Sequence, residues 1–396
     1  MSFPESLLSQ TTRSMGVSFI REMIKATKGV EGMISLAGGY PAPQSYPFEV
    51  IKQLSTAVLE KYGTKALQYD MTEGFLPLRE ALVPYLAQKG IETTAAGICI
   101  TSGSQGLLDA LGKVLITPGD AVAVEGPTYL GALSAFNPYG PRYVCAAMDD
   151  EGILPDALER ILAAHAVKFV YLVPTFQNPT GRSLGVARRH QIAELLDKYD
   201  VLLCEDDPYS DLRYRGEALP TMYSLIPERT VYTTTLSKVF APGLRIGICV
   251  APEPVRKWLV LAKQGVDLNT STFNQAMAAE YLLGGYLEKQ IPKIIDLYKP
   301  KQEVMLNALD RYFPREWHYN KPEGGMFIWV EGPKGTDAEK LYWKCIERKA
   351  AFVPGKFFFP CEGDGLETMR LNYTMSSEEE IERGIKIIGD TIQEGF

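Results

Sequence analysis

Four side chains that could act together lie between residues 235 and 245 of this chain. Thr235 and Ser237 come just before Lys238, and Arg245 follows after a Pro-Gly turn. Hydroxyl groups and an arginine can hold a phosphate, and a lysine amine can attack a carbonyl carbon. A surface lysine in a turn explains the same residues, because most lysines are exposed. This stretch alone leaves both interpretations open.

A second candidate stretch, Thr101-Ser-Gly-Ser-Gln-Gly, follows an apolar run and precedes a leucine-rich helix pattern. Its backbone N–H groups and the Ser104 hydroxyl could bind an anion at the helix N-terminus. The simpler alternative is that Ser104 only caps the helix, and this alternative is favoured for the stretch taken alone.

Two more polar side chains follow apolar runs. Tyr129 ends Glu125-Gly-Pro-Thr-Tyr, and Asn178 lies in Gln177-Asn-Pro-Thr-Gly. A half-buried core position is the better explanation for Tyr129 alone, and Asn-Pro followed by Gly is a strong turn signal. The Asn178 side chain could still form a hydrogen bond with a ligand.

Three carboxylates follow a buried run in Glu205-Asp-Asp-Pro-Tyr. Acids in this position are difficult to explain as a solvated loop, and one of them could pair with a protonated ring nitrogen. Metal binding is the competing interpretation, but no histidine accompanies the acids and their spacing does not fit a calcium loop.

These stretches follow short apolar runs that alternate with helix patterns such as Leu107–Ile116 and Arg188–Lys198. The runs are Gly97–Ile100, Ala121–Val124, Tyr143–Ala146, Lys168–Val173, Val201–Cys204, Thr230–Thr234 and Ile246–Val250. Continuous apolar runs are typical of strands buried on both faces. We therefore predict an α/β fold with a doubly wound, mostly parallel, seven-stranded sheet, whose ligands bind beyond the carboxyl ends of the strands.

The rest of the chain predicts a second, smaller α+β domain that is discontinuous in sequence. We expect an N-terminal arm and part of the small domain in 1–45, a large domain in 46–290 and a small C-terminal domain in 291–396. The region 286–313 is predicted to be a long helix broken at Pro292 and again near Pro300. The last helix is predicted to open at Ser376-Ser377 in a capping arrangement with the glutamates that follow, and to carry Ile381, Ile385 and Ile388 on one face.

Composition narrows the classes of function. The chain has 396 residues and a net charge of −7, which argues against a nucleic acid as the main partner. No apolar run is long enough to span a membrane, and the first residues lack the pattern of a secretory signal. The six cysteines form no CxxC pair, and none of the three histidines lies in a motif. We therefore expect no metal site and a cytoplasmic protein that uses lysine and carboxylate chemistry or a cofactor.

Taken together, the motifs carry a family resemblance. They are Gly103-Ser-Gln, Pro127-Thr-Tyr, Asn178-Pro-Thr-Gly, Asp206-Asp-Pro-Tyr, Ser237-Lys-x-x-Ala-Pro-Gly-Leu-Arg-Ile-Gly and Met369-Arg-Leu. The set resembles the class I/II aminotransferases of pyridoxal phosphate fold type I, and within them the kynurenine/2-aminoadipate aminotransferase branch. The resemblance runs from about Ile34 to Ile388 with the motifs in family order. Gly106 departs from the family, which often has a second glutamine there.

The resemblance implies a role for each residue that would contact the cofactor ring of pyridoxal 5'-phosphate. Lys238 would bond covalently to the cofactor and then move the substrate proton. Asp206 would pair with the ring nitrogen, Tyr209 and Asn178 would bind the ring hydroxyl, and Tyr129 would stack on the ring. Free lysine is almost wholly protonated at neutral pH, so the site must lower the pKa of Lys238.

The resemblance also implies a phosphate site and a substrate site. The phosphate would be held by Ser104, Gln105, Thr235, Ser237 and Arg245, and by Tyr69 from the second subunit of a homodimer. The substrate carboxylate would be bound by Arg370 in a two-pronged grip that suits a guanidinium group, with Asn178 beside it. Gly39 and Tyr40 would close over the substrate. Arg21 could reach a side-chain carboxylate, although an exposed helix arginine is an equally good explanation.

The implied activity is amino-group exchange between an L-amino acid, of the 2-aminoadipate, aromatic or branched-chain type, and a 2-oxo acid such as 2-oxoglutarate. The same fold and cofactor also serve β-lyases and decarboxylases. A third alternative is the effector domain of an aminotransferase-like regulator. The acidic charge and the short segment before Ile34 argue against that alternative.

Overall fold

The computed structural model describes residues 5–9, 11–12, 15, 29–360 and 363–396. Within them, eight strands form the central sheet in the order β2-β9-β8-β7-β6-β3-β4-β5. These strands are β2 (Ile98–Ser102), β3 (Ala121–Gly126), β4 (Arg142–Asp149), β5 (Gly152–Ile153), β6 (Val167–Leu172), β7 (Leu202–Asp206), β8 (Thr230–Thr235) and β9 (Ile246–Val250). The seven predicted runs correspond to all of them except the two-residue β5.

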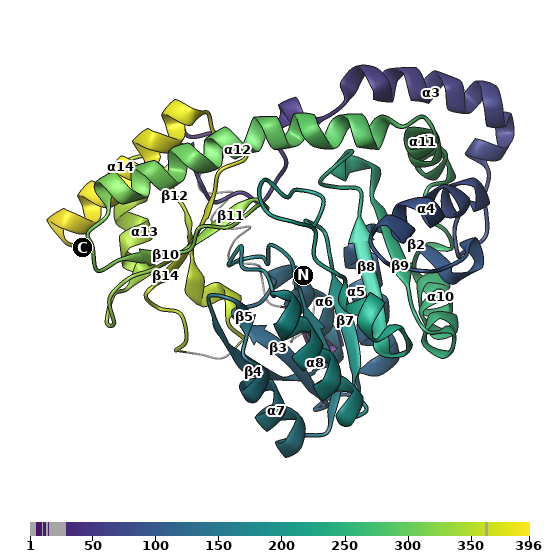
Figure 1. Ribbon diagram of the computed structural model, residues 1–396, viewed down its shortest axis with the longest axis horizontal. Coiled ribbons are helices and arrows are strands. Elements are labelled where there is room, and N and C mark those ends of the chain that lie inside the picture. The colour runs from purple at the N-terminus through teal and green to yellow at the C-terminus, as the bar shows by residue number, and fades with distance from the viewer. Residues whose placement is uncertain (1–4, 10, 13–14, 16–28, 361–362) are drawn as a thin grey trace.

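The sheet is mostly parallel. The β4-β3-β6-β7-β8 pairs run parallel, whereas β9 is antiparallel to both β8 and β2, and β5 is antiparallel to β4. Both faces of the sheet are covered (Figure 1). Alternate residues along a strand enter two different cores: Val122 and Tyr171 belong to one, and Ala123 and Val170 to the other. This is the predicted doubly wound α/β arrangement.

The helices associated with this sheet supply the two cores. In chain order they are α3 (Phe48–Tyr62), α4 (Leu76–Gln88), α5 (Gly103–Leu115), α6 (Leu130–Phe136), α7 (Pro155–Ala164), α8 (Val186–Lys198), α9 (Met222–Leu225), α10 (Glu253–Asp267) and α11 (Thr272–Leu283). Leucines of α5 pack in the hydrophobic core that contains Tyr171. Apolar side chains of α7 and α8 pack in the core that contains Val170. No helix of the described residues is long and apolar enough to cross a membrane.

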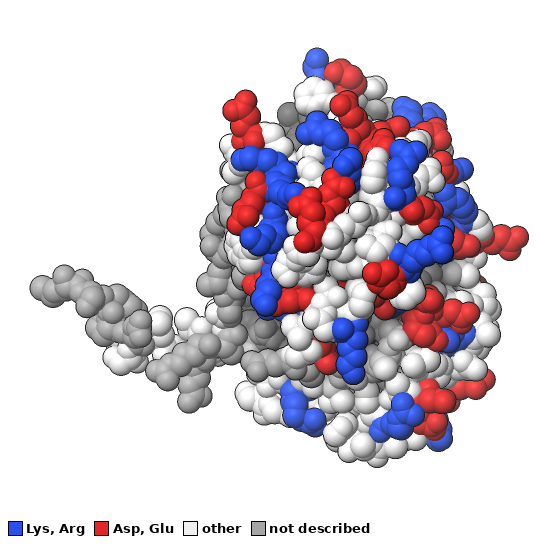
Figure 2. All heavy atoms as spheres, turned by 90° about the vertical axis from the view of Figure 1, so that its left-hand side faces the viewer, with Lys and Arg blue, Asp and Glu red and all other residues white. Residues whose placement is uncertain are grey.

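A second group of elements lies beside the large sheet (Figure 1). It contains β1 (Ile34–Ser35), β10 (His318–Tyr319), β11 (Phe327–Glu331), β12 (Ala350–Ala351), β13 (Val353–Pro354), β14 (Thr368–Asn372), α13 (Ala338–Glu347) and α14 (Glu378–Glu394). β1 pairs with β12, so the segment that precedes the large sheet joins the C-terminal elements. The face of this group that Figure 2 shows carries acidic and basic side chains interspersed. The domain boundaries predicted from the sequence stay a prediction.

One predicted feature is wrong. Helix α12 (Tyr286–Tyr312) continues through both Pro292 and Pro300, although each proline lacks the N–H that an intrahelical bond needs. The helix continues because its apolar face, including Tyr298 and Met305, is buried along its length, which offsets two missing hydrogen bonds. In Figure 1 it runs from α11 to α14 and so connects the two groups of elements.

The prediction for the last helix is confirmed. Ser377 caps α14 in a capping box with Glu380, and Ile381, Ile385 and Ile388 are all buried.

Candidate active site

The polar stretches converge because parallel strands end at one edge of the sheet. Asp206 is the last residue of β7, Thr235 is the last residue of β8, and α5 begins at Gly103 directly after β2. The ends of such strands are where open α/β sheets bind ligands. The edge therefore brings a carboxylate, hydroxyl groups and a helix N-terminus together.

Asp206 is a buried carboxylate with one oxygen engaged and one free. The Tyr171 hydroxyl donates to Oδ2 at 2.8 Å, whereas Oδ1 is buried and has no hydrogen-bond partner among the described residues. Burial, and then the nearby charge of Asp207, raise the pKa of Asp206 to about 7. A cationic N–H facing Oδ1 would keep this carboxylate ionised and satisfy the free oxygen.

Lys238 has the lowered pKa that nucleophilic lysines need. Burial, and then the positive charges of Arg370 and Arg245, lower the pKa of Lys238 from its ordinary 10.5 to about 8. Its Nζ donates to the Gly39 carbonyl at 3.2 Å and lies 5.9 Å from the centre of the Tyr209 ring. A usable fraction of this amine is therefore neutral near pH 7 to 8.

Arg370, on β14, brings a buried positive charge to the site from the C-terminal group of elements. Its Nη1 donates to Asn178 Oδ1 at 2.9 Å and its Nη2 donates to the Ala37 carbonyl at 2.7 Å. The guanidinium carbon lies 4.4 and 5.0 Å from the ring centres of Phe327 and Phe358. Within the described part of the chain, its buried Nε has no partner. Burial lowers its pKa to about 10, so the group stays charged at neutral pH.

An anion cradle lies where Gly103 meets Arg245. Gly103 has a φ of +70°, and a Cβ atom there would lie 2.2 Å from Arg245 Nη2. Arg245 Nη2 also donates to the Ser102 carbonyl at 3.1 Å, and the Thr235 and Ser237 hydroxyls are 2.8 Å apart. The missing Cβ thus lets a guanidinium group lie against the first turn of α5, where anions bind favourably.

Four more predicted residues follow strands that end at this edge of the sheet. Ser104 and Gln105 lie in the first turn of α5, but the Gln105 side chain donates to the Gly131 carbonyl at 2.8 Å, which leaves its backbone N–H for a ligand. Tyr129 is half-buried in the N-cap position of α6. Asn178 Nδ2 donates to the Tyr209 hydroxyl at 3.5 Å.

Two other predicted residues have exposed side chains. Tyr69 is 76% exposed, and Tyr40, next to Gly39, is 56% exposed. Arg21 lies outside the described residues.

Three residues that contact the site were not predicted from the sequence. Tyr171 lies inside an apolar run and looked like an ordinary core residue, and nothing local indicates that its hydroxyl reaches Asp206. Phe327 lies on β11, which pairs with the strand of Arg370, and Phe358 comes shortly before that strand. The aromatic residues near Met369-Arg-Leu in the sequence were the only available signal, and it is too common to be diagnostic.

Comparison with known proteins agrees with this geometry. Residues 33–388 match the family model for aminotransferase class I and II. The chain is 45% identical to an aromatic-amino-acid aminotransferase of Thermococcus litoralis, over 98% of this chain and 95% of that protein. It is 40% identical to a 2-aminoadipate transaminase of Thermus thermophilus, over 95% and 94%.

A solved structure extends the similarity to three dimensions. The kynurenine aminotransferase of Pyrococcus horikoshii, solved in complex with PMP, superposes with a TM-score of 0.95 at 44% identity, covering 98% of both chains. The match to the family model and these relatives extend over almost the whole chain. The protein therefore belongs to the class I and II aminotransferases and is a pyridoxal phosphate-dependent aminotransferase of fold type I.

Proposed function

We propose that this aminotransferase takes its amino group from L-amino acids with large side chains, of the 2-aminoadipate, aromatic or branched-chain type. The amino acceptor is a 2-oxo acid such as 2-oxoglutarate. The relatives that carry these names support the donor class. The observation that carries the proposal is the position of Arg370 between two phenylalanine rings, with a buried Nε that has no partner among the described residues. A carboxylate bound there would lie beside apolar surface that suits a bulky side chain.

The site residues fit pyridoxal 5'-phosphate, whose protonated ring withdraws electrons from the substrate when it is bound. Asp206 Oδ1 is free to accept from a ring N–H, and Tyr209 and Asn178 can bind a ring hydroxyl. Tyr129 supplies a stacking surface. The phosphate is held in the cradle of Gly103 and Arg245, by Ser104, the Gln105 backbone, Thr235 and Ser237. The free oxygen of Asp206 and the space kept by Gly103 support this assignment.

Lys238 and Arg370 divide the work on the substrate. Arg370 binds the α-carboxylate, with Asn178 bound to its Nη1. Lys238 Nζ takes the proton from the substrate Cα and later releases it to another atom. Its pKa of about 8 leaves part of the amine neutral near neutral pH, so it can accept this proton. Gly39 and Tyr40 close over the substrate, and the contact of the Gly39 carbonyl with Lys238 supports their closeness to the reacting atoms.

We also propose a homodimer in which Tyr69 reaches the phosphate cradle of the second subunit. Leu67, Tyr69 and Met71 are 71, 76 and 61% exposed, which is unusual for neighbouring apolar side chains of a folded chain. A dimer contact would bury them.

Two further assignments complete the proposal. A cytoplasmic location is supported by Cys99 and Cys249, which are free thiols although they are directly opposite each other on β2 and β9. We also assign two domains: a small one formed by 1–45 and 291–396, and a large one formed by 46–290. The pairing of β1 with β12 supports this division.

The experiment that tests the donor class is a panel of amino acids offered at equal concentration to the cofactor-loaded enzyme. Loss of the visible absorption of the cofactor reports amino transfer, and 2-oxoglutarate should then yield glutamate. We expect 2-aminoadipate and the aromatic or branched-chain amino acids to have higher kcat/KM than alanine and aspartate. Faster conversion of aspartate or alanine would overturn the proposed donor class.

A further inference from the structure

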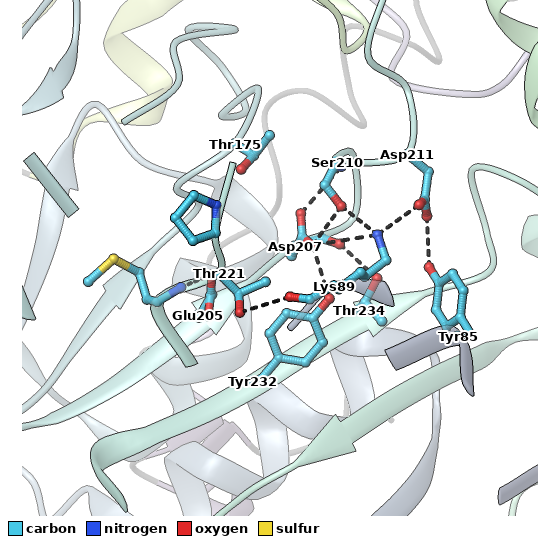
Figure 3. Close-up of polar contacts among 12 residues, drawn as sticks. Tyr85, Lys89, Thr175, Glu205, Asp207, Ser210, Asp211, Thr221, Tyr232 and Thr234 are labelled. Carbon is cyan, nitrogen blue, oxygen red and sulfur yellow. Dashed lines mark hydrogen bonds and ion pairs between the residues drawn. The ribbon is translucent and has the colours of Figure 1, made fainter. Parts of the chain in front are cut away.

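Asp207 directs its carboxylate into a different network from that of its neighbour Asp206. Asp207 Oδ2 accepts from the Ser210 hydroxyl at 2.7 Å and from the Tyr232 hydroxyl at 3.0 Å, both of which Figure 3 shows. The backbone of Asp207 is fixed to β8, because its N–H donates to the Thr233 carbonyl at 2.8 Å. The end of β7 is therefore firmly held, and the chain leaves it at Pro208.

The turn that follows, residues 207–211, lies over a cavity. This cavity has a volume of about 390 Å³, and polar side chains that line it include Lys89, Glu205, Asp207, Ser210 and Asp211. Asp206 and Tyr209 do not line it; the Tyr209 ring is instead near Lys238. Protein segments are normally held in place by close packing. A turn with a cavity on one side lacks packing there, so it needs another restraint.

Lys89, the residue that directly follows helix α4, supplies that restraint. Its Nζ donates to Ser210 Oγ and to Asp211 Oδ1, both at 2.7 Å, and lies 4.0 Å from Asp207 Oδ2. The Tyr85 hydroxyl, one turn earlier on α4, donates to Asp211 Oδ2 at 2.7 Å. Figure 3 shows the ammonium group of Lys89 directed between the side chains of Asp207, Ser210 and Asp211.

The electrostatics of this network favour a permanently charged lysine. Burial lowers the pKa of Lys89, but Tyr85, Asp211 and Asp207 outweigh burial and raise it above its ordinary value. Its side chain is only 12% exposed. A buried ammonium group between two carboxylates leaves both of them uncompensated when it is removed, so the turn should then shift.

We propose that Lys89 is a positioning residue for the cofactor site: its ammonium group holds the turn 207–211 from the cavity side and thereby fixes Tyr209 on the other side. This inference rests on the proposed roles of Asp206 and Tyr209. Lys89 touches neither substrate nor cofactor and acts only through the turn.

The chain offers a matched control for Lys89. Lys198, the last residue of α8, donates to Glu159 at 2.7 Å, and its Nζ lies 5.1 Å from the Tyr199 ring centre. Lys89 has the same arrangement with Asp211 and with the Tyr85 ring, at 2.7 and 5.2 Å. Both lysines are at the C-terminal end of a helix, but Lys198 precedes the start of β7, whereas Asp206 ends that strand, and Lys198 is 60% exposed.

The experiment compares Lys89→Met, Lys89→Arg and Lys198→Met as full-length proteins. The dissociation constant for pyridoxamine 5'-phosphate is measured on the cofactor-free protein, and the circular dichroism of the visible band is measured on the loaded enzyme. Lys89→Met should weaken binding about tenfold or more, the size of effect expected when a group that orients a ligand-binding residue is lost. It should also change the circular dichroism, lower kcat and leave KM for the amino donor within about threefold, since Arg370 is untouched.

Lys89→Arg keeps the charge and the donors, so it should restore most of the affinity, and Lys198→Met should match the parent in every measurement. Where Lys89→Met does not fold, Ser210→Ala decides, because it removes the hydroxyl that bridges Lys89 Nζ and Asp207 Oδ2 and changes no charge. Unchanged affinity and circular dichroism in Lys89→Met, or in Ser210→Ala where that variant decides, would overturn the inference. Asp206→Asn serves as the reference. If both Lys89→Met and Asp206→Asn leave the affinity unchanged, the proposed site itself is wrong. If Asp206→Asn weakens binding and Lys89→Met does not, only the role of Lys89 is wrong.

Discussion

Arg245 occupies the space that a side chain at residue 103 would need, because a Cβ atom on Gly103 would lie 2.2 Å from its Nη2. The Gly103 backbone is in the left-handed region, with a φ of +70°, so a larger residue would be strained there as well. Glycine at residue 103 therefore leaves room for the guanidinium group at the N-terminus of α5.

The first prediction follows from this contact. Gly103→Ala should displace Arg245 and raise the dissociation constant for pyridoxal 5'-phosphate about tenfold or more, because a charge-assisted hydrogen bond contributes about 1.5–3 kcal/mol. The control is Gly106→Ala, since a Cβ there meets nothing closer than 3.7 Å. Equilibrium binding to the cofactor-free proteins measures both. Equal affinities for the two variants would contradict the assigned phosphate cradle.

The second prediction separates the two adjacent aspartates. Asp206→Asn should lower kcat/KM far more than Asp207→Asn, by about 100-fold or more if a buried charged pair of about 3–5 kcal/mol is lost. The reason is that Asp206 Oδ1 is buried without a partner among the described residues, whereas the carboxylate of Asp207 is engaged by Ser210 and Tyr232. Steady-state kinetics at saturating cofactor give the order, and the reverse order would refute the assignment.

The third prediction concerns the pH at which Lys238 becomes reactive. Only the neutral amine attacks a carbonyl, so the rate of covalent capture of pyridoxal 5'-phosphate should rise with pH and level off above the pKa of about 8. Arg370 is the second cause of the lowered pKa, after burial, so Arg370→Gln should move the midpoint upward. Stopped-flow absorption between pH 6 and pH 10 measures the profile. A midpoint near the ordinary lysine value in the parent protein would show that the site does not activate Lys238.

The lowered pKa also predicts the sign of a stability change. Below about pH 8 the folded, cofactor-free protein must bury a protonated amine, and this penalty is relieved as pH rises from 8 towards 10.5, where the unfolded chain loses the same proton. Lys238→Met should therefore be more stable than the parent at pH 7, and this difference should shrink as the pH is raised through that window. Denaturant unfolding at both ends of the window measures it.

The fourth prediction tests the shared site. Lys238→Ala and Tyr69→Phe chains, each impaired alone, should regain activity on mixing, because a heterodimer would contain one site with both residues intact. The exposure of Tyr69 within its own chain motivates the test. A fully active monomer in sedimentation, or no recovery on mixing chains that exchange freely, would rule out the shared site.

The fold was predictable because its signals are local. Continuous apolar runs identified the strands from β2 to β9 apart from β5, and polar motifs at the strand ends indicated the binding edge. A local signal was misleading at Pro292 and Pro300. Proline usually breaks a helix, but the buried apolar face of α12 keeps this helix continuous through both residues. Tertiary packing decided the outcome there, and sequence alone does not show it.

The site was predictable only at the level of residue types. Arg370 meets Asn178 across 192 residues of sequence and meets Ala37 across 333, and no spacing rule gives such contacts. The engagement of the Gln105 side chain by the Gly131 carbonyl and the support of the turn 207–211 by Lys89 likewise depend on how distant segments pack.

The most direct test of the whole account is to find which lysine carries the cofactor. The protein loaded with pyridoxal 5'-phosphate is reduced with borohydride, digested and mapped by mass spectrometry. We predict one pyridoxyl group per chain, on Lys238, and none in Lys238→Ala. A label on any other lysine, or an unchanged label in Lys238→Ala, would contradict the assignment of the active site.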